Sequence, residues 1–459
     1  MTVTRPMVPM DADAETVPAA GVPSGPGGGA ERRRITVVGA GSGYMPGVIR
    51  GLIHRAGDLA GSDLVFHDIH ADHLDLMTRL AGRMFAAAGA ELAVRAEADL
   101  RAALVDTDFV FTTFRPGGLP ARHLDESIPL RHGVMGQETA GPGGFLMACR
   151  SVPVLLRIAA LLAEVAPRAW IVNYTNPTNI VTGAVIRESA ARIVGLCDQH
   201  AGDQALWAGL LGLPADRLEV DWIGLNHATW GERVRVDGAD VGVAARLAGL
   251  RPPAGADPAT AQLVEIGAAL GLLPNSYARY YFFHDEIMAD LRASGTTRAE
   301  DLTAMLPGYY RRVAAAAEAE RPDPGRERGG GDHGEFAVDV ICALARDEGG
   351  RFVVNTANRG AVTGLDAGTV VEVPAVLSAA GVTPMVAGPV PRPVRGLTAA
   401  VAEYEWLAER AAVTGDLRTA LQALMSHPFV TSKRAAEAIL AEGLAAHREH
   451  LPQFTGPNR

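Results

Sequence analysis

The chain has 459 residues, enough for two domains or one large α/β unit, and 48% of them are hydrophobic while 20% are charged. The 42 basic and 52 acidic residues give a formal net charge of −10, which argues against general binding to nucleic acids or anionic membranes. No apolar run reaches the roughly 18 residues of a membrane span, and the three scattered cysteines do not form a disulfide framework. We therefore expect a cytoplasmic protein with reduced thiols, which binds neither nucleic acid nor membrane.

The beginning of the chain differs in composition from the rest. Residues 1–33 are rich in Pro, Gly and Ala but contain no continuous apolar core, so they are not a secretory signal. We expect them to form a disordered tail. The apolar run 35–38 then predicts a buried parallel strand, followed by a glycine-rich turn and a helix opened by Pro46.

Four further apolar runs alternate with helical stretches: "DLVFHDI", "DFVFTTF", "AWIVNYTNP" and "ARIVGLCD". This alternation predicts an α/β fold with a Rossmann-like, doubly wound parallel sheet. Ligands of such sheets gather at the carboxyl ends of the strands. Five residues lie at or just past these ends, namely Gly39, Asp68, Arg115, Asn176 and Cys197.

The segment "GAGSGYMP" is similar to a dinucleotide-binding turn. Gly39 and Gly41 match the pattern, whereas Tyr44 occupies the position of the third glycine. A turn at a helix N-terminus suits a pyrophosphate, and Ser42 can add a hydroxyl donor. Asp68 would accept hydrogen bonds from the ribose hydroxyls, which favours NAD over NADP. The alternative is a tight structural turn followed by a solvated acid.

Two other polar groups follow predicted strands. Arg115 and Arg122 can hold an anionic or polyhydroxylated ligand through forked hydrogen bonds, or they can form structural salt bridges. Asn173 and Asn176 lie at a strand end before Pro177, where they can bind substrate or cofactor. Asn176 can alternatively cap the following helix.

Cys197 and His227 end two different strand-like runs. One thiolate and one imidazole form an incomplete ligand set for a divalent metal, and an incomplete set leaves positions for substrate oxygens. The alternative for Cys197 is a small core residue. Tyr277, Tyr280 and Tyr281 form a cluster in a chain with only eight tyrosines, which serves either chemistry or aromatic packing.

The rest of the chain has weaker signals. Residues 232–262 are rich in Ala, Gly and Pro, and we expect a variable surface excursion there. Residues 321–336 form a second predicted flexible stretch, which we place over a site. From about residue 397 the pattern is helical.

Taken in order, these motifs resemble glycoside hydrolase family 4 from about residue 34 to residue 454. The resemblance rests on "GAGSGYMP", "RPGG", "GQETAGPGG", "NYTNP", "GLC", "GLNH", "YARYY" and "VEVP". It implies a fold like that of lactate or malate dehydrogenase, with an NAD-binding Rossmann domain over 34–198. Residues 199–459 would form an α+β domain for metal binding, substrate binding and oligomerisation. It further implies NAD and Mn²⁺ or another divalent metal as cofactors, a small sugar as substrate, and a homodimer or homotetramer.

The chemistry that the resemblance implies is a redox route, in contrast to the two-carboxylate route of most glycosidases. NAD⁺ takes a hydride from the sugar 3-hydroxyl, and the resulting ketone acidifies the proton on carbon 2. A tyrosine removes that proton while the metal stabilises the enediolate. The glycosidic oxygen then leaves, water adds and the hydride returns.

The resemblance also assigns roles. Cys197 and His227 take the positions of the metal ligands, and Asp198 that of the acid. Tyr277 is the expected general base, with Tyr280 as the second choice; a phenol of reference pKa near 10 needs positive charge nearby, which the metal or Arg279 can supply. The expected cofactor-binding residues are Gly39, Gly41, Ser42, Asp68 and Asn176, and the expected substrate-binding residues are Arg115, Asn173, Asn176 and Arg279.

Departures from the family pattern concern the substrate. Gln199 and His200 replace the Met-Pro pair that commonly follows Cys-Asp, and "GDHGEF" resembles the α-type branch while "GRERGGG" resembles the β-type. We expect a glycosidase acting on 6-phosphoglycosides. The alternative is an NAD-dependent sugar epimerase or oxidoreductase that uses the same site. A catalytically silent regulator would lack the Cys, His or Tyr positions, and all are present.

Overall fold

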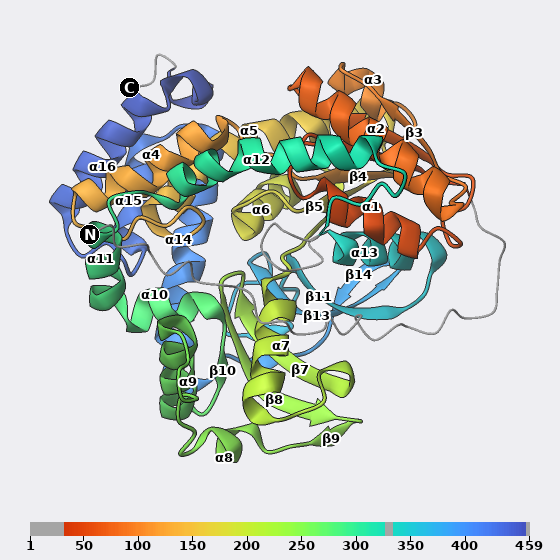
Figure 1. Ribbon diagram of the computed structural model, residues 1–459. Helices are drawn as coiled ribbons and strands as arrows, with labels where there is room; N and C mark the ends of the chain where they lie inside the picture. The colour runs from red at the N-terminus through yellow and green to blue at the C-terminus, as the bar shows by residue number, and fades with distance from the viewer. Residues whose placement is uncertain (1–31, 326–333, 456–459) are drawn as a thin grey trace, which may run out of the picture.

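The computed structural model describes residues 32–325 and 334–455. The predicted tail, up to residue 31, and residues 326–333 of the predicted flexible stretch lie outside these ranges. Within them, the largest feature is a nine-stranded sheet with the order β14-β13-β11-β6-β5-β4-β1-β2-β3 (Figure 1).

Six neighbouring strands of this sheet are parallel, in the order β3-β2-β1-β4-β5-β6. This is the strand order of the doubly wound dinucleotide-binding fold, so the predicted fold is confirmed. The strands are β1 (Arg34–Val38), β2 (Asp63–His67), β3 (Ala93–Ala96), β4 (Phe109–Thr112), β5 (Trp170–Asn173) and β6 (Arg192–Gly195). The carboxyl ends of these strands form one edge of the sheet. Gly39, Asp68, Asn176 and Cys197 each come shortly after a strand, next to this edge.

Three antiparallel strands from the second half of the chain extend this sheet beyond β6: β11 (Gly350–Ala357), β13 (Val370–Ser378) and β14 (Gly381–Pro384). β11 pairs with β6 at Asn355 and Gly195, which covers an edge that would otherwise present unpaired backbone groups. The sheet therefore continues past the expected division at residue 198. Sequence periodicity did not predict this joining of the two halves.

Helices cover both faces of the large sheet. One face packs against α1 (Met45–His54), α2 (Ala71–Ala88) and α13 (Glu335–Arg346), and the other against α3 (Leu100–Leu104), α5 (Gly141–Val165) and α6 (Thr178–Glu188). Ile35 and Val37 contribute to the first core and Val38 to the second, which is the alternation that a strand buried on both faces requires.

α5 is the one described helix that is long and apolar enough to cross a membrane by length and composition, although the sequence showed no uninterrupted apolar run of that length. However, 67% of its most apolar window is buried inside the fold. Its Arg150 is fully buried and pairs with Asp125 of α4 (Gly118–Arg131) through two N–H donors at 2.8 and 2.6 Å. α5 therefore has the environment of a core helix.

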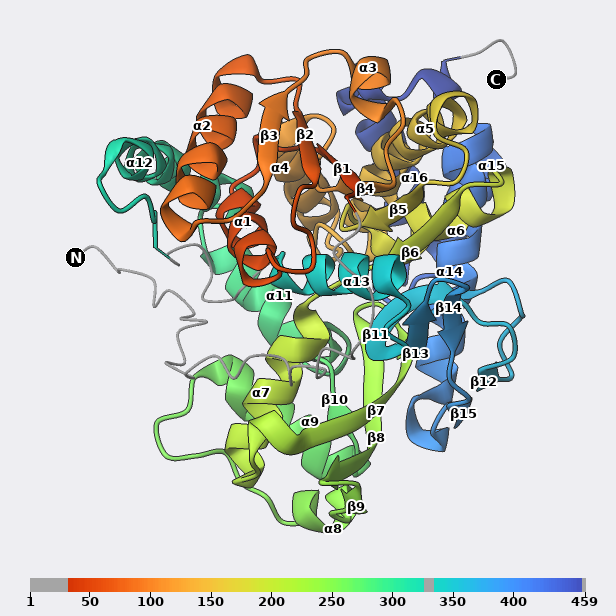
Figure 2. The ribbon, with the colours of Figure 1, turned by 90° about the vertical axis from the view of Figure 1, so that its right-hand side faces the viewer.

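A smaller antiparallel sheet lies below the large one, together with α7 (Gln199–Leu211), α8 (Val243–Leu247) and α9 (Pro258–Leu270) (Figure 2). Its strands are β7 (Leu218–Leu225), β8 (Ala228–Val236), β9 (Ala239–Asp240) and β10 (Leu273–Pro274). The surface excursion predicted over 232–262 is largely exposed, but it contains regular elements. This segment contains the end of β8, all of β9 and α8, and the start of α9. Single apolar residues such as Val234 and Leu247 anchor these elements in one core.

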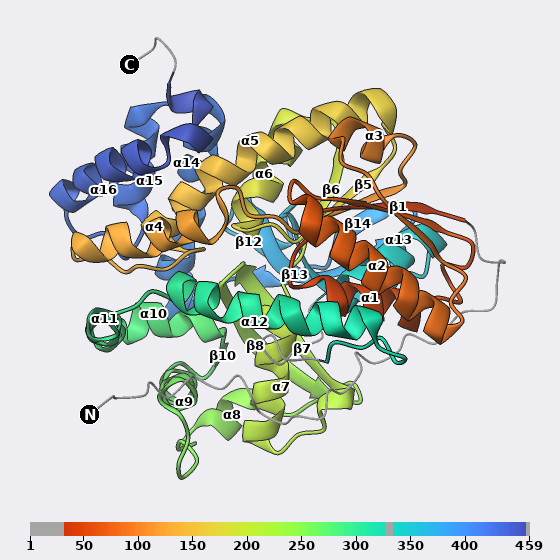
Figure 3. The ribbon, with the colours of Figure 1, turned by 45° about the horizontal axis from the view of Figure 1, so that its top comes forward.

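The remaining helices are α10 (Arg279–Phe282), α11 (His284–Ala293), α12 (Arg298–Glu318), α14 (Arg395–Thr414), α15 (Leu417–Ser426) and α16 (Lys433–Ala446). The last three confirm the helical pattern predicted from about residue 397. α12 runs from α4 to α2, across the front of the large sheet's first face (Figure 3). The short strands β12 (Val362–Thr363) and β15 (Gly388–Pro389) pair with each other.

Candidate active site

Cys197 and His227 come from different sheets and meet. Cys197 follows the end of β6 by two residues, and His227 occupies the two-residue turn between β7 and β8 in a left-handed conformation with φ +62°. The distance from Cys197 Sγ to His227 Nε2 is 3.7 Å. The predicted pairing of these residues is therefore geometrically sound.

Hydrogen bonds fix the tautomer of the His227 ring. The Thr139 hydroxyl donates to Gln137 Oε1 at 3.0 Å, so its oxygen is left to accept a proton from His227 Nδ1 at 3.2 Å. Nε2 then carries the lone pair and faces the sulfur. Burial lowers the pKa of His227 to about 3, which keeps the imidazole neutral near pH 7. A neutral imidazole oriented by a partner on its other nitrogen is the form that binds metals.

Glycines bring the loop of Gln137 and Thr139 against the start of α5. A Cβ on Gly143 would lie 2.2 Å from the Gln137 carbonyl oxygen, and one on Gly144 would lie 2.6 Å from that of Thr139. Gln137 Oε1 also accepts from the backbone N–H groups of Thr139 and Ala140, at 2.6 and 2.8 Å. The "GQETAGPGG" motif thus builds the support of His227, a role that the sequence did not assign to Gln137 or Thr139.

The donor pair suits a divalent ion in both chemistry and spacing. The 3.7 Å between Cys197 Sγ and His227 Nε2 is short enough for both atoms to bind one divalent ion. Burial, then the charge of Glu372, raises the pKa of Cys197 to about 12, so a cation is needed to stabilise the thiolate. The part of the chain that the structure describes contains no cluster of three or more His, Cys, Asp or Glu able to hold a metal. Cys197 and His227 stay the predicted pair of metal ligands.

Tyr277 lies directly against this pair. Its ring stacks on His227 with centroids 3.8 Å apart and an interplanar angle of 8°. It belongs to the short turn Ser276–Ala278, which follows β10. Asn275 shapes this turn because its Oδ1 accepts from Tyr277 N at 2.8 Å while its own N–H donates to Thr229 O at 3.1 Å. The strand that follows His227 therefore also holds Tyr277.

The electrostatic surroundings separate Tyr277 from Tyr280. Burial raises the pKa of Tyr277 well above its ordinary value, with Tyr280 and Glu138 adding to the effect. Burial also raises the pKa of Tyr280, but the Arg279 charge opposes the shift there. Arg279 was expected to act on Tyr277. Its Nε instead donates to Gln262 Oε1 at 2.7 Å, and its charge stabilises the phenolate of Tyr280.

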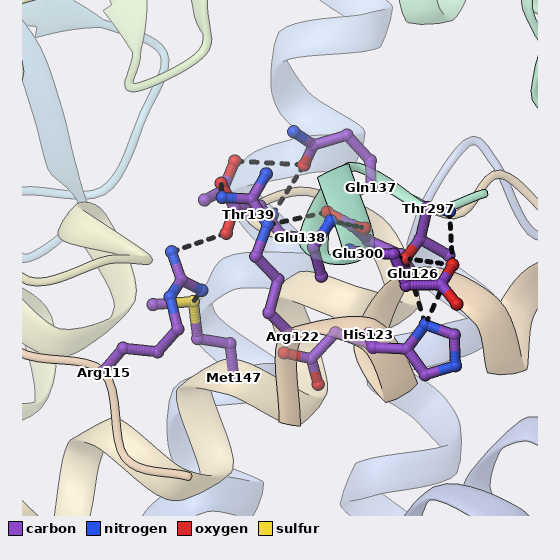
Figure 4. A network of polar contacts seen from close by, with 12 residues as sticks. Arg115, Arg122, His123, Glu126, Gln137, Glu138, Thr139, Met147, Thr297 and Glu300 are labelled. Atoms are coloured by element: carbon purple, nitrogen blue, oxygen red, sulfur yellow. Dashed lines mark hydrogen bonds and ion pairs between the residues drawn. The ribbon is translucent and has the colours of Figure 1, made fainter. Parts of the chain in front are cut away.

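The two predicted arginines form one network (Figure 4). Arg115 Nη2 lies 2.5 Å from Glu138 Oε2, and Arg122 Nη1 lies 3.0 Å from Glu138 Oε1. Arg122 Nε also donates to Glu126 Oε1 at 2.7 Å. Glu138 lies between Gln137 and Thr139 in the loop that contacts His227, so this network borders the Cys197 site. The structural salt bridges that the sequence left open are present, and each guanidinium has further N–H donors.

The two asparagines of "NYTNP" have different environments. Asn173 is fully buried; its Oδ1 accepts from Thr112 Oγ1 at 2.9 Å and from Thr175 N at 3.1 Å. It orders the strand end, and its contact with a substrate stays a prediction. Asn176 Oδ1 accepts from Thr178 Oγ1 at 3.2 Å. Pro177 rather than Asn176 is the N-cap of α6, without a side-chain bond, so the capping alternative was wrong.

The glycine turn has the compactness that a dinucleotide site needs. Gly39 has φ +95°, and a Cβ there would lie 2.3 Å from the Thr113 carbonyl oxygen. Gly41 N donates to Asp68 Oδ2 at 2.8 Å, and His70 N donates to Asp68 Oδ1 at 2.8 Å. A carboxylate has about four acceptor positions, so Asp68 keeps capacity for ribose hydroxyls. The Ser42 hydroxyl accepts a hydrogen bond from the backbone N–H of Tyr44.

Helix α12 holds the same turn from outside. Tyr310 Oη donates to Gly41 O at 2.9 Å and Tyr309 Oη donates to Gly43 O at 2.8 Å. The Tyr310 ring also stacks on His73 of α2, with centroids 4.1 Å apart. In the sequence, the adjacent tyrosines of α12 were the signal for this contact with the glycine turn, and the sequence analysis did not use it.

The comparisons with known proteins agree with this geometry. The family described as "Family 4 glycosyl hydrolase" matches residues 34–213, and "Family 4 glycosyl hydrolase C-terminal domain" matches residues 222–430. The chain is a family 4 glycoside hydrolase. It is 38% identical over 437 residues to a probable 6-phospho-beta-glucosidase of Bacillus subtilis, covering 92% of this chain and 98% of that protein. It is 32% identical to a 6-phospho-beta-glucosidase of Escherichia coli, with 92% and 97% coverage.

Solved structures extend the comparison to fold and ligands. A 6-phospho-alpha-glucosidase from gut microorganisms, solved in complex with NAD and Mn²⁺, has a TM-score of 0.83 at 27% identity, covering 93% of this chain and 100% of that one. A malate dehydrogenase from Plasmodium falciparum has a TM-score of 0.52 at 14% identity, over 83% of this chain and 98% of its own. The second likeness confirms the predicted dehydrogenase-like fold of this family 4 enzyme.

Proposed function

We propose that this family 4 glycoside hydrolase cleaves 6-phospho-β-glucosides with NAD and a divalent metal such as Mn²⁺. The observation that carries the proposal is the cluster of Cys197, His227 and Tyr277. It contains a thiol and an imidazole suited to bind a metal, and a phenol ring stacked on the imidazole. The two relatives at 38% and 32% identity are both named 6-phospho-beta-glucosidases, which supports the β-type substrate. We also propose a cytoplasmic enzyme that forms a homodimer or homotetramer.

The residues take distinct roles in this proposal. Cys197 Sγ and His227 Nε2 would hold the metal, and Asp68 with the turn of Gly39 and Gly41 would hold the dinucleotide. When bound, NAD⁺ supplies a hydride acceptor for sugar carbon 3, and the metal supplies a Lewis acid whose charge also favours a nearby phenolate.

Proton transfer belongs to two side chains of the chain itself. Tyr277 Oη takes the proton from carbon 2, because its ring stacks on that of His227 with centroids 3.8 Å apart. Asp198, which directly follows Cys197 and precedes α7, delivers a proton to the departing glycosidic oxygen. Arg115 and Arg122 border the site with guanidinium N–H groups suited to phosphate or hydroxyl oxygens.

The proposal is tested by analysing the products from a panel of phosphorylated and unphosphorylated α- and β-glycosides, with NAD⁺ and Mn²⁺ present. We expect cleavage of the 6-phospho-β-glucosides, dependence on NAD⁺ and no net NADH. Stoichiometric NADH with an oxidised sugar would instead support a sugar oxidoreductase. An uncleaved sugar of inverted configuration would support an epimerase.

A further inference from the structure

A buried carboxylate outside the proposed reaction, Asp203 of α7, bonds the turn that carries Tyr277. Its side chain is 1% exposed. Its Oδ2 accepts from Ser276 N at 3.2 Å, and its Oδ1 accepts from the Ser276 hydroxyl and from Gln199 Nε2, the latter at 3.0 Å. Gln199 Nε2 also donates to the Ser276 hydroxyl at 3.2 Å.

These bonds join the two halves of the candidate active site. Gln199 begins α7 two residues after Cys197, and Ser276 directly precedes Tyr277. One helical turn beyond Asp203, Trp207 Nε1 donates to Pro274 O at 3.1 Å, so the same face of α7 holds the turn at a second point. The position of Tyr277 relative to Cys197 thus depends on α7.

The chemistry of the cluster requires a carboxylate. Every group that meets the two Asp203 oxygens is a donor: a backbone N–H, a hydroxyl and an amide NH₂. An asparagine would have nearly the same volume but would point its own NH₂ at one of these donors, and an unpaired buried donor is costly. The substitution therefore loosens the Tyr277 turn without opening a cavity.

We infer that Asp203 is a positioning residue, which sets the Tyr277 phenol against the metal-ligand pair through Ser276. This inference rests on the proposed function, because it takes Tyr277 as the base for carbon 2. A misplacement of about 1 Å in such a group can lower a rate about 100-fold. The effect should appear in proton abstraction and not in ligand binding.

The test compares Asp203→Asn with the wild type and with Asp216→Asn, an exposed acid in the connection that follows α7. We expect kcat to fall about 10- to 100-fold, while KM and the Kd values for NAD⁺ and Mn²⁺ change less than about threefold. The primary isotope effect with substrate deuterated at carbon 2 should rise. Ser276→Ala, which keeps the backbone N–H bond, should give a smaller loss in the same direction, and it decides the matter if Asp203→Asn does not fold.

A double-mutant cycle separates positioning from general stability. If Asp203 acts through Tyr277, adding Asp203→Asn to Tyr277→Phe should lower the rate less than about twofold further. Equal losses on both backgrounds, or an Asp203→Asn enzyme that behaves like Asp216→Asn, would overturn the inference. Failure of the wild type to cleave, or to exchange the proton on carbon 2, would instead overturn the proposed function.

Discussion

At the scale of single residues, the site depends on how each side chain is held. Cys197 taken alone is a small residue after an apolar run, and its position 3.7 Å from His227 Nε2 is what makes it a ligand candidate. The other two cysteines, Cys149 and Cys342, are free and buried in helices. Thr139 orients the imidazole of His227, since the Thr139 hydroxyl lies within hydrogen-bond distance of His227 Nδ1. Of the three cysteines, Cys197 is therefore the one that we propose as a metal ligand.

Removing one ligand should remove the metal. We expect Cys197→Ala to weaken Mn²⁺ binding by more than about 100-fold, because losing a direct ligand costs more than losing a supporting group. NAD⁺ affinity should change little, since the dinucleotide turn follows a different strand. Titration calorimetry with Mn²⁺ and with NAD⁺ checks both statements. Cys342→Ala is the matched control, and wild-type turnover that is insensitive to chelators would refute the metal site.

At the scale of elements, the sequence predicted the positions of single strands and helices better than the contacts between elements that are distant in the chain. Five of the six strands of the parallel sheet have their own apolar run, so the positions of Asp68 and Cys197 at strand ends could be predicted, whereas the short exposed strand β3 could not. The pairing of Cys197 with His227 could be proposed from their residue types and from the family resemblance, but the sequence did not show that β7 and β8 belong to another sheet. Asp203 and Tyr310 were missed, since a helix pattern does not tell which loop its polar residues meet. The pairing of β11, β13 and β14 with the parallel sheet could not be predicted either, because an apolar run does not tell which strand it pairs with.

Helix α12 gives a prediction at this scale. Tyr310 donates to the carbonyl oxygen of Gly41, and the N–H of Gly41 donates to Asp68, so the two bonds fix the peptide groups on either side of Gly41 in the dinucleotide turn. Losing one such bond costs about 1 kcal/mol, or roughly fivefold in affinity. We expect Tyr310→Phe to raise the Kd for NAD⁺ by about that factor with Mn²⁺ binding unchanged. Thr303→Ala on the same helix is the control, and equal Kd values for the two variants would contradict the role of Tyr310.

At the scale of the whole molecule, the chain brings two layers of structure to one edge. The large sheet supplies the glycine turn and Cys197, and the smaller sheet supplies His227 and the Tyr277 turn (Figure 2). β11 pairs with β6, and its neighbour β13 contacts β7 of the smaller sheet, so these strands join the two layers. The large sheet accounts for the similarity of the fold to malate dehydrogenase, and the smaller sheet contributes two of the three residues of the proposed site.

The central claim is that hydrolysis proceeds through loss of the proton on carbon 2, and wild-type turnover in deuterium oxide tests it most directly. With NAD⁺, Mn²⁺ and a 6-phospho-β-glucoside, we predict that the released sugar phosphate carries deuterium at carbon 2 and that no net NADH accumulates. Proton exchange at that carbon requires a base in the position of Tyr277 and an oxidised neighbour at carbon 3. Cleaved product without deuterium at carbon 2 would contradict the account.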